Sequence, residues 1–347
     1  MVHINNFHRA YIDALRLDGH EVYVMARGEG ADFDIPFEKK MLSGQNGRCR
    51  RMIREILARE NFDAVILNTT LAAFHIRLAM KKKDRPRVIN IVHGYLFPRG
   101  SGGVKKRILL FCERLLRKKT DAILVMNDED LKIANENKLT CGKVELILGM
   151  GASCPRERVS REAVRKELGA EDSFAMCYVG ELSKRKNQRL LIEALADVKR
   201  EIPNAMLWLV GDGDERGALE DYSAALGVAD SVAFTGKRDN PCDFIRAADL
   251  YVSASNIEGL PFNIIEALGV GAAVVGSDIK GQRDLLSSGA GVLFKCGDRA
   301  ELKEKILAVY NGDISPSAEK KKEVYELYSF ENAFPKTYAL IKGALSE

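Results

Sequence analysis

Short apolar segments recur along this chain, and each is followed by a stretch with helical spacing. Strands that alternate with helices form parallel sheets, because a crossover helix must bring the chain back to the edge where the next strand begins. Two series of such strands predict an α/β protein with two Rossmann-like doubly wound domains. The expected strands are residues 21–26, 64–68, 88–93 and 122–127 in the first series, and 174–180, 206–211, 250–255 and 272–277 in the second.

The length of 347 residues and the hydrophobic content of 46% allow two domains with a core each. The strand pattern breaks between residues 148 and 169, where glycine and proline interrupt it. We therefore expect an N-terminal domain over residues 1–152 and a C-terminal domain over residues 153–329. Residues 330–347 have a helical pattern with no strand after it, and we expect this helix to cross back to the N-terminal domain.

The N-terminal domain lacks a recognisable opening strand. A doubly wound domain begins with a buried strand, but this chain starts MVHINNFHRAYIDALRLDGHEV and enters a helical pattern by about Asn6. We expect that the recorded start lies downstream of the real one. The alternative is a sheet that is completed in another way.

Charge is divided unevenly between the two halves. Residues 1–155 contain 27 Lys and Arg against 18 Asp and Glu, an excess of nine positive charges, whereas the remainder has an excess of five negative charges. Basic clusters at 81–87, 105–107 and 114–119 carry most of the excess. They form either a solvated face or a surface for an anionic partner. An anionic membrane surface or a diphosphate-bearing acceptor fits better than nucleic acid, because the clusters lack interleaved aromatic residues.

The seven cysteines are scattered, without C-x-x-C or metal-type spacing. This pattern indicates reduced thiols in the cytoplasm rather than disulfides, and we expect no bound metal. No apolar run approaches the roughly 20 residues that span a bilayer, and the N-terminus has no signal-peptide pattern. We therefore expect a cytoplasmic protein, or one that is peripheral on the inner face of the cytoplasmic membrane.

Ligands of open α/β sheets bind beyond the carboxyl ends of the strands, so the residues after each strand are candidates for a site. Three basic residues, 184–186, follow the strand that ends at Gly180 and precede a helix, where a phosphate would suit them. The alternative is an ordinary exposed turn. His93 ends another strand and is followed by Gly94, which leaves space for a ligand; a structural histidine is equally compatible with this pattern.

Two further strands end in loops of interest. Gly211 opens a glycine-rich turn into a helix, which is a weak signal by itself. Lys237 and Arg238 follow the segment VAFTG, where a flat base could lie against their aliphatic stems.

Two carboxylates flank the start of one predicted helix, in the segment EGLPFNIIEALG. Glu258 lies in the loop before the helix and Glu266 about one and a half turns into it, so both can approach a helix N-terminus that itself attracts anions. Two carboxylates at this helix end would repel an anion that has no other groups to offer them. A ligand with both hydroxyl groups and negative charge fits, because its hydroxyls can donate to the carboxylates. If Glu266 accepts from ribose hydroxyls and Glu258 from sugar hydroxyls, a diphosphate can lie over the helix N-terminus at 261–265. The segment predicts a nucleotide-sugar site.

Four segments carry a family resemblance: YVGELSKRKNQRLLIEAL, LVGDGDER, FTGKRDNPCDFIRAADLYVSASNIEGLPFNIIEAL and GAAVVGSDIKGQRDLL. In this order and at these separations they resemble the nucleotide-sugar-binding half of a family 4 retaining glycosyltransferase. INNFHRAYIDALRLDGHEV, NIVHGYLFPRG and ERLLRKKTDAILVMNDEDLKIA resemble, more loosely, the capsular and exopolysaccharide branch of that family. The resemblance implies the GT-B fold, in which two Rossmann-like domains face a central cleft.

The resemblance also implies roles for single residues. Glu266 would hold the nucleotide ribose. Glu258 would hold the transferred sugar, together with the backbone N–H groups of Gly259 to Phe262. Lys186 would bind phosphate, and His93 would approach the donor sugar from the opposite domain.

One position departs from the family pattern, because Glu181 stands where the family usually has an arginine. Arg185 is the candidate to replace that arginine. The expected catalytic residues are His93, Glu258 and Lys186. The expected donor-binding residues are Glu266, Gly259, Leu260, Pro261, Phe262, Asn263, Ile264, Arg185, Gly180, Gly211, Lys237 and Arg238.

The implied activity is retaining transfer of a sugar from a nucleotide sugar, with no metal and no cofactor. Lys186 with the helix N-terminus can meet the charge of the leaving diphosphate. The capsular likeness alone favours a UDP-sugar donor and, as acceptor, a lipid-linked surface polysaccharide such as a polyprenyl-diphosphate-linked sugar. The alternative from another class is a nucleotide-sugar-binding, non-catalytic partner subunit of another glycosyltransferase.

Overall fold

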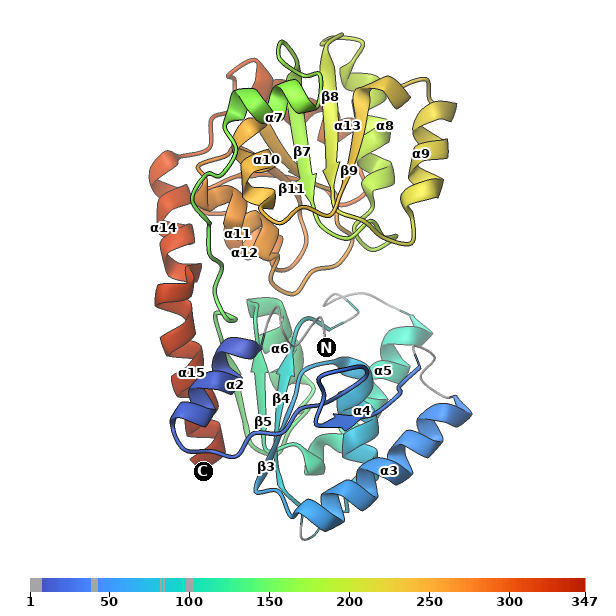
Figure 1. Ribbon diagram of the computed structural model, residues 1–347, viewed down its shortest axis with the longest axis vertical. Helices are drawn as coiled ribbons and strands as arrows, with labels where there is room; N and C mark the ends of the chain where they lie inside the picture. Colours follow the sequence, from blue (N-terminus) through green and yellow to red (C-terminus); the bar gives the residue numbers. More distant parts are fainter. Residues whose placement is uncertain are drawn as a thin grey trace. The chain divides into compact units, whose positions relative to one another are not determined.

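The computed structural model describes residues 8–38, 43–81, 83, 85–95, 97 and 103–346, apart from the side chain of Lys105 (Figure 1). The chain divides into two compact units. Unit 1 comprises Met1–Met150 and Phe330–Glu347, and unit 2 comprises Gly151–Ser329.

Unit 2 is built on a six-stranded parallel sheet with the order β12-β11-β10-β7-β8-β9. Read from the other edge, this is the 3-2-1-4-5-6 order of dinucleotide-binding folds. The central strands are buried on both faces, which explains why their sequences are nearly continuous apolar runs. The strands are β7 (Phe174–Val179), β8 (Ala205–Val210), β9 (Val232–Gly236), β10 (Leu250–Ser253), β11 (Val274–Ser277) and β12 (Val292–Phe294).

Helices connect these strands and bury apolar stripes against the sheet. On α8, Leu191 and Leu195 recur at helical spacing and share one core with Leu207 and Leu209 of β8. The helices of unit 2 are α7 (Arg161–Glu167), α8 (Gln188–Val198), α9 (Arg216–Ala225), α10 (Pro241–Ala247), α11 (Phe262–Gly269), α12 (Gln282–Leu286), α13 (Arg299–Tyr310) and α14 (Ala318–Tyr328), with a 3-10 turn, η2 (Ala229–Ser231).

The order of the strands locates a crevice in unit 2. β7 and β10 are neighbours, but the chain adds β8 and β9 on one side of them and β11 and β12 on the other. Where the winding reverses in this way, the loops after the two central strands lead in opposite directions and leave a crevice between them. The loops that follow β7 and β10 therefore frame the expected ligand site.

Unit 1 is built on a four-stranded parallel sheet in the order β3-β4-β5-β6. Three of its strands match segments expected from the sequence, and the predicted fold class, α/β with two parallel-sheet Rossmann-like domains, is confirmed. The strands are β3 (Ala64–Leu67), β4 (Arg87–Val92), β5 (Ala122–Val125) and β6 (Lys143–Leu146).

The strand expected over residues 21–26 is largely wrong. Only Met25–Ala26 forms a strand, β1, and it pairs in parallel with β2 (Phe33–Asp34) outside the main sheet. Just before it, the Val24 N–H donates to a carboxylate oxygen of Asp32 at 2.6 Å, so a side chain takes the place of a ladder partner. The expectation of a missing opening strand concerns residues 1–7, which lie outside the described residues.

The C-terminal helix α15 (Phe330–Ser346) belongs to unit 1. Asp18, at the end of α2, accepts hydrogen bonds from Tyr338 at 2.8 Å and from Lys342 at 2.6 Å, and the Arg87 guanidinium donates to the carbonyl of Ala344. Among the described helices, none combines the length and apolarity needed to cross a membrane. The other helices of unit 1 are α2 (Arg9–Leu17), α3 (Gly44–Glu60), α4 (Thr70–Ala79), α5 (Val104–Leu116) and α6 (Asp128–Glu136), with a 3-10 turn, η1 (Arg117–Lys119).

Candidate functional site

The loops after β7 and β10 are fastened to each other at the crevice of unit 2. The backbone N–H of Asn256 donates to the carbonyl of Arg185 at 2.9 Å, and its side-chain amide donates to the carbonyl of Lys184 at 3.2 Å. The Asn263 side chain also donates to Val179, the last residue of β7, at 2.8 Å. Two segments that are distant in sequence thus form one wall, and the residues on them keep fixed positions relative to each other.

Glu258 is held at this wall by two cations. Lys186 Nζ lies 2.6 Å from Glu258 Oε1, and Arg185 Nη1 lies 2.9 Å from Glu258 Oε2. Glu258 and Lys186 are buried, whereas the side chain of Arg185 is 43% exposed. The sequence predicted these residues for phosphate and for sugar separately, and the structure brings them together. Arg185 Nη2 also lies 4.0 Å from a carboxylate oxygen of the exposed Glu181, so two cations and two carboxylates meet at this wall.

Glu266 lies half-buried on α11, and no described residue donates a hydrogen bond to its carboxylate. Burial removes water from this group and raises its pKa to about 7. A buried carboxyl without protein donors has its acceptor oxygens available for a ligand with hydroxyl groups. This environment agrees with the expected ribose contact, which stays a prediction.

The N-terminus of α11 is suited to an anion. The N-cap residue, Pro261, makes no side-chain cap hydrogen bond, and no acidic residue lies in the first turn of the helix. The first N–H groups of such a helix carry a partial positive charge. The preceding segment is packed tightly, because a Cβ on Gly281 would lie 2.3 Å from the carbonyl oxygen of Gly259. The helix end is therefore fixed in position, and its partial positive charge suits a phosphate.

The side chains of Leu260 and Ile264 are buried, at 8% and 0% exposure. Only their backbone groups are therefore suited to meet a donor. The Asn263 side chain joins α11 to β7 through its Nδ2 atom, which donates to Val179, and its Oδ1 atom accepts from the N–H of Ile264 within α11 at 3.0 Å. Pro261 is the N-cap of the helix, and Phe262 is its first residue.

Gly180 and Gly211 have positive φ angles of 150° and 142°. A Cβ on Gly211 would lie 2.0 Å from the carbonyl oxygen of Gly180, and a Cβ on Gly180 would lie 2.6 Å from the hydroxyl of Tyr178. Both glycines therefore let the loops after β7 and β8 run against each other. This packing gives them a structural role, and a contact with the donor stays a prediction.

Lys237 and Arg238 follow β9, at the edge of the sheet, and both are exposed. The Arg238 guanidinium lies 2.6 Å from a carboxylate oxygen of Glu167 and 5.0 Å from the ring centre of Phe244. The side chain of Arg238 is thus oriented by α7 and α10. The expected stacking of a base on these stems stays a prediction.

Two serines were not predicted. Ser183 follows β7 and Ser255 follows β10, so their hydroxyls lie on the two loops that frame the crevice. Each hydroxyl is buried and has no hydrogen-bond partner within the described part of the chain. Unsatisfied buried hydroxyls are uncommon and often await a ligand or water. Ser183 lies three residues after the predicted strand 174–180, and Ser255 is the last residue of the predicted strand 250–255; these positions are the signal that could have marked them.

His93 follows β4 in unit 1, and a cluster of polar side chains surrounds it. Its ring lies edge-on to that of His8, with 5.0 Å between the ring centres, and Tyr11 lies 5.5 Å from His8. The Tyr11 hydroxyl is bonded to Asn68, which follows β3, and burial raises the pKa of Tyr11. The carboxyl ends of β3 and β4 thus share one polar cluster. His93 was predicted from the sequence, but Asn68, which also ends a predicted strand, was not.

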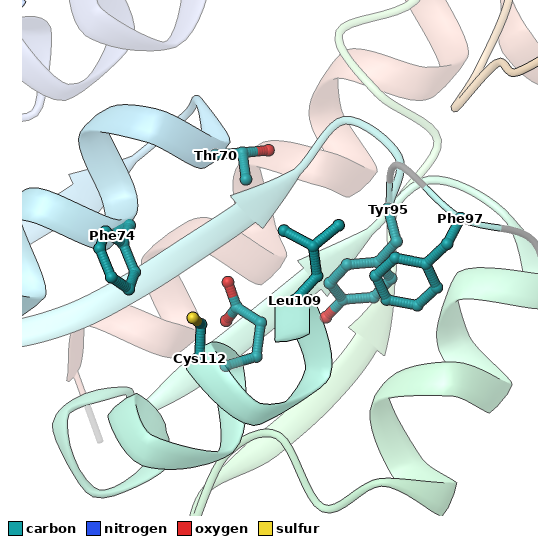
Figure 2. Close-up of a pocket in the computed structure, with 7 residues that line it drawn as sticks. Thr70, Phe74, Tyr95, Phe97, Leu109 and Cys112 are labelled. Carbon is teal, nitrogen blue, oxygen red and sulfur yellow. The ribbon is translucent and has the colours of Figure 1, made fainter. Parts of the chain in front are cut away.

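A mostly apolar hollow lies between α4, α5 and the segment after β4 (Figure 2). The rings of Tyr95 and Phe97 stack at 5.6 Å along one side. Glu113, the one charged residue of the lining, has both carboxylate oxygens bonded by the buried Arg77 at 2.9 and 3.0 Å. The lining consists of Thr70, Phe74, Tyr95, Phe97, Leu109, Cys112 and Glu113, and the hollow encloses about 360 Å³, part of it open to solvent.

No group of three or more His, Cys, Asp or Glu side chains in the described ranges is arranged to hold a metal ion.

Comparison with known proteins adds to this geometry. Residues 5–147 match the family described as Glycosyltransferase Family 4, and residues 160–325 match the family described as Glycosyl transferases group 1. The putative glycosyltransferase EpsD of Bacillus subtilis (strain 168) is 29% identical over 324 residues, which cover 89% of this chain and 85% of that protein.

Two further proteins illustrate the range of the similarity. The UDP-Gal:alpha-D-GlcNAc-diphosphoundecaprenol alpha-1,3-galactosyltransferase of Escherichia coli is 24% identical over 241 residues, or 67% of this chain and 62% of that protein. The structure of sucrose-phosphate synthase from Thermosynechococcus elongatus superposes with a TM-score of 0.78 at 18% identity and covers 96% of this chain and 92% of that one. At this level of identity, the structural likeness concerns the fold alone.

Proposed function

Because the chain belongs to glycosyltransferase family 4 and has the GT-B fold, we propose that it transfers a sugar from a UDP-sugar to a lipid-linked glycan, with retention of configuration. The observation that carries the proposal is the arrangement at the crevice of unit 2. Glu258 with its two cations supplies contacts for the sugar, and the N-terminus of α11 supplies contacts for the diphosphate. The Glu266 carboxyl, to which no described residue donates a hydrogen bond, supplies contacts for the ribose.

In the proposed reaction, the acceptor hydroxyl attacks the anomeric carbon on the face from which the UDP diphosphate leaves. The bond from that carbon to the diphosphate oxygen breaks, the bond to the acceptor oxygen forms, and the hydroxyl proton leaves with the departing diphosphate. Lys186, Arg185 and the N–H groups of α11 stabilise the negative charge that develops on the diphosphate. Glu258 orients the sugar through its hydroxyls. The role of His93 rests on the family resemblance.

The name of one relative supports the choice of substrates. The Escherichia coli relative is named for transfer from UDP-galactose to a diphosphoundecaprenol-linked sugar, and EpsD is a putative glycosyltransferase of Bacillus subtilis. For this chain we propose the substrate classes in the name of the Escherichia coli relative, a UDP-sugar and an acceptor on a lipid diphosphate. A protein that meets such an acceptor works at the cytoplasmic face of the membrane, as a peripheral protein.

We also propose that no metal ion is needed. The positive charge of Lys186, Arg185 and the helix N-terminus can take the place of a divalent cation at the diphosphate. Addition of a chelator should leave sugar transfer largely unchanged. Loss of transfer in chelator, restored by Mn²⁺ or Mg²⁺, would show that the phosphate site is assigned wrongly.

Two measurements test the proposed function. A thermal-unfolding screen of UDP-, GDP- and ADP-sugars should show stabilisation by a UDP-sugar alone, by about 2.7 kcal/mol at 100 times its Kd. Release of UDP should then require a lipid-diphosphate-linked acceptor. Preference for a guanosine or adenosine donor contradicts the uridine assignment. Donor binding without turnover on any lipid-linked acceptor contradicts catalysis and favours a non-catalytic partner subunit.

Calorimetry with UDP tests the placement of the two carboxylates. Glu266→Ala should weaken UDP binding by about tenfold to a hundredfold, because a charged hydrogen-bond acceptor is lost. Glu258→Ala should weaken it less, since UDP has no transferred sugar. Equal binding of UDP by Glu266→Ala and the parent chain would refute the ribose assignment.

A further inference from the structure

Helix α5 of unit 1 exposes a line of large apolar side chains. Val104, Ile108, Phe111 and Leu115 are 72%, 56%, 65% and 61% exposed. Their spacing of four, three and four residues places them on one side of the helix, as a stripe about 16 Å long. The opposite side of α5 carries the buried residues Glu113 and Leu116.

This stripe differs from the ordinary apolar content of a protein surface. Single exposed apolar residues are common and need no explanation, but a continuous line of them marks an interaction surface. The helix does not need these four side chains for its own packing, because Leu109, Leu110 and Leu116 already face the unit. The stripe is therefore available to an apolar partner.

Positive charge borders the stripe. Arg107 and Arg114 are exposed and seven residues apart, so they lie along one edge of it, and the exposed Lys118 follows in η1. The one acidic residue of α5, Glu113, is buried and paired with Arg77. The outward surface of the helix thus combines apolar and basic side chains without an acidic one, which is the pattern of helices that lie in a bilayer interface.

We propose that α5 docks on an anionic lipid bilayer, with the stripe among the headgroups and upper acyl chains and the basic edge against lipid phosphates. The charge complementarity of the basic edge selects this occupant over a second copy of the chain, which would bring like charges together. The inference deepens the proposed function and rests on it in one respect: a lipid-linked acceptor is reached from a bilayer surface.

Vesicle cosedimentation of the full chain tests the proposal. The vesicles contain phosphatidylcholine alone or an equal mixture with phosphatidylglycerol, in about 0.1 M and about 1 M salt, where the Debye length is about 10 Å and about 3 Å. The parent chain should bind the mixed vesicles, and part of this binding should persist in high salt because apolar contacts are not screened. A purely electrostatic footprint would lose all binding there.

Matched surface variants assign the binding to α5. Ile108→Ser with Phe111→Ser should lower the partition coefficient by about tenfold or more. Its control, Leu17→Ser with Met52→Ser, removes exposed apolar side chains from α2 and α3 and should bind like the parent chain. Arg107→Gln with Lys118→Gln should lower binding at low salt, and its control, Arg51→Gln with Arg54→Gln on α3, should not.

Tryptophan fluorescence measures insertion of the stripe into the bilayer directly. The chain has one tryptophan, Trp208, which is fully buried in unit 2. Phe111→Trp should therefore add an emission that shifts to shorter wavelength with mixed vesicles. An unshifted emission, or equal binding by the stripe variant and its control, overturns the proposal. So does a sedimentation result in which the stripe joins two copies of the chain and neither vesicle binds.

UDP calorimetry on the same variants separates the two proposals. All the α5 variants should bind UDP like the parent chain, because the donor residues lie in unit 2. If the parent chain binds vesicles through α5 but not UDP, the proposed function fails and the docking surface stands. If it binds UDP but no vesicles, the docking surface fails alone.

Discussion

At the scale of single residues, the central feature is Glu258 between Lys186 and Arg185. The two cations differ in environment, because Lys186 is 9% exposed and the side chain of Arg185 is 43% exposed. A buried charge that loses its partner is costly, whereas an exposed ion pair contributes little.

We therefore expect Lys186→Ala to lower the free energy of unfolding by about 3 kcal/mol and Arg185→Ala by about 1 kcal/mol or less. Lys186→Ala leaves the buried Glu258 carboxylate with only its exposed partner. Urea unfolding of both variants measures the difference. Equal losses would mean that the two cations stabilise the carboxylate equally. The control is Lys184→Ala, which removes an 88% exposed side chain from the same loop.

The raised pKa of Glu266 predicts a pH dependence of UDP binding. The ionised carboxyl is the better acceptor for ribose hydroxyls, so affinity should rise as the pH passes about 7. The phosphates of UDP also titrate in this pH range, but their effect cancels in the ratio of UDP affinity between the parent chain and Glu266→Gln. This ratio should increase between pH 6 and 8 by about tenfold at most. A ratio that stays constant over this range would exclude Glu266 as the titrating contact.

The same shift affects stability with a defined sign. The folded-state pKa of Glu266 lies above its ordinary value of 4.5, so its stabilising contribution is fully present below about pH 4.5 and is lost as the pH rises through about 7. The loss amounts to about 3 kcal/mol at most. A bound ribose would lower the pKa and restore part of it.

Some of these residues could be predicted from the sequence and others could not, for a physical reason. The spacing of Glu258 and Glu266 around a glycine-proline turn is local, and the sequence alone predicts it. The contact between Lys186 and Glu258 joins residues 72 positions apart. The contact between His8 and His93 joins the start of α2 to the end of β4. Such contacts depend on strand order, which hydrophobic periodicity does not specify.

At the scale of elements, the ends of β7 and β8 set the strictest packing. Gly211→Ala should lower the free energy of unfolding by more than about 2 kcal/mol, because its Cβ would meet the Gly180 carbonyl at 2.0 Å in a positive-φ conformation. Gly217→Ala is the matched control, since its Cβ would meet nothing within 4 Å on α9 and should be neutral or slightly stabilising. Urea unfolding compares them, and a tolerated Gly211→Ala would show that the two loops can separate.

Elements were predicted well where burial is continuous and poorly where side chains replace backbone partners. β7, β8 and β10 lie in apolar runs and were predicted within a residue or two of their bounds. The segment before β1 has the same apolar appearance, but the backbone of Val24 is bonded to the Asp32 carboxylate and to the N–H of Phe33 rather than to a strand of the main sheet. The pattern of hydrophobic residues does not predict a contact with a single acidic side chain eight residues away.

At the scale of the whole molecule, unit 1 is made from two separate stretches of the chain. Removal of residues 330–346 should destabilise unit 1, because Asp18 loses its bonds to Tyr338 and Lys342 and Arg87 loses its bond to Ala344. Unit 2 should keep its UDP binding, since its residues run without interruption from Gly151 to Ser329. Scanning calorimetry with and without UDP checks this, and a loss of UDP binding on truncation would show that α15 supports the donor site.

The return of α15 also has a consequence for synthesis on the ribosome. Residues 1–150 emerge first, but the helix that completes their unit emerges last, with Arg87 and Ala344 separated by 257 positions. At about 5–20 residues per second, translation of unit 2 takes roughly 10–40 s. During that interval the surfaces of α2 and β4 that α15 later covers are open to chaperones or to other nascent chains. Unit 2 is therefore the first to finish folding, although it is the second to be made.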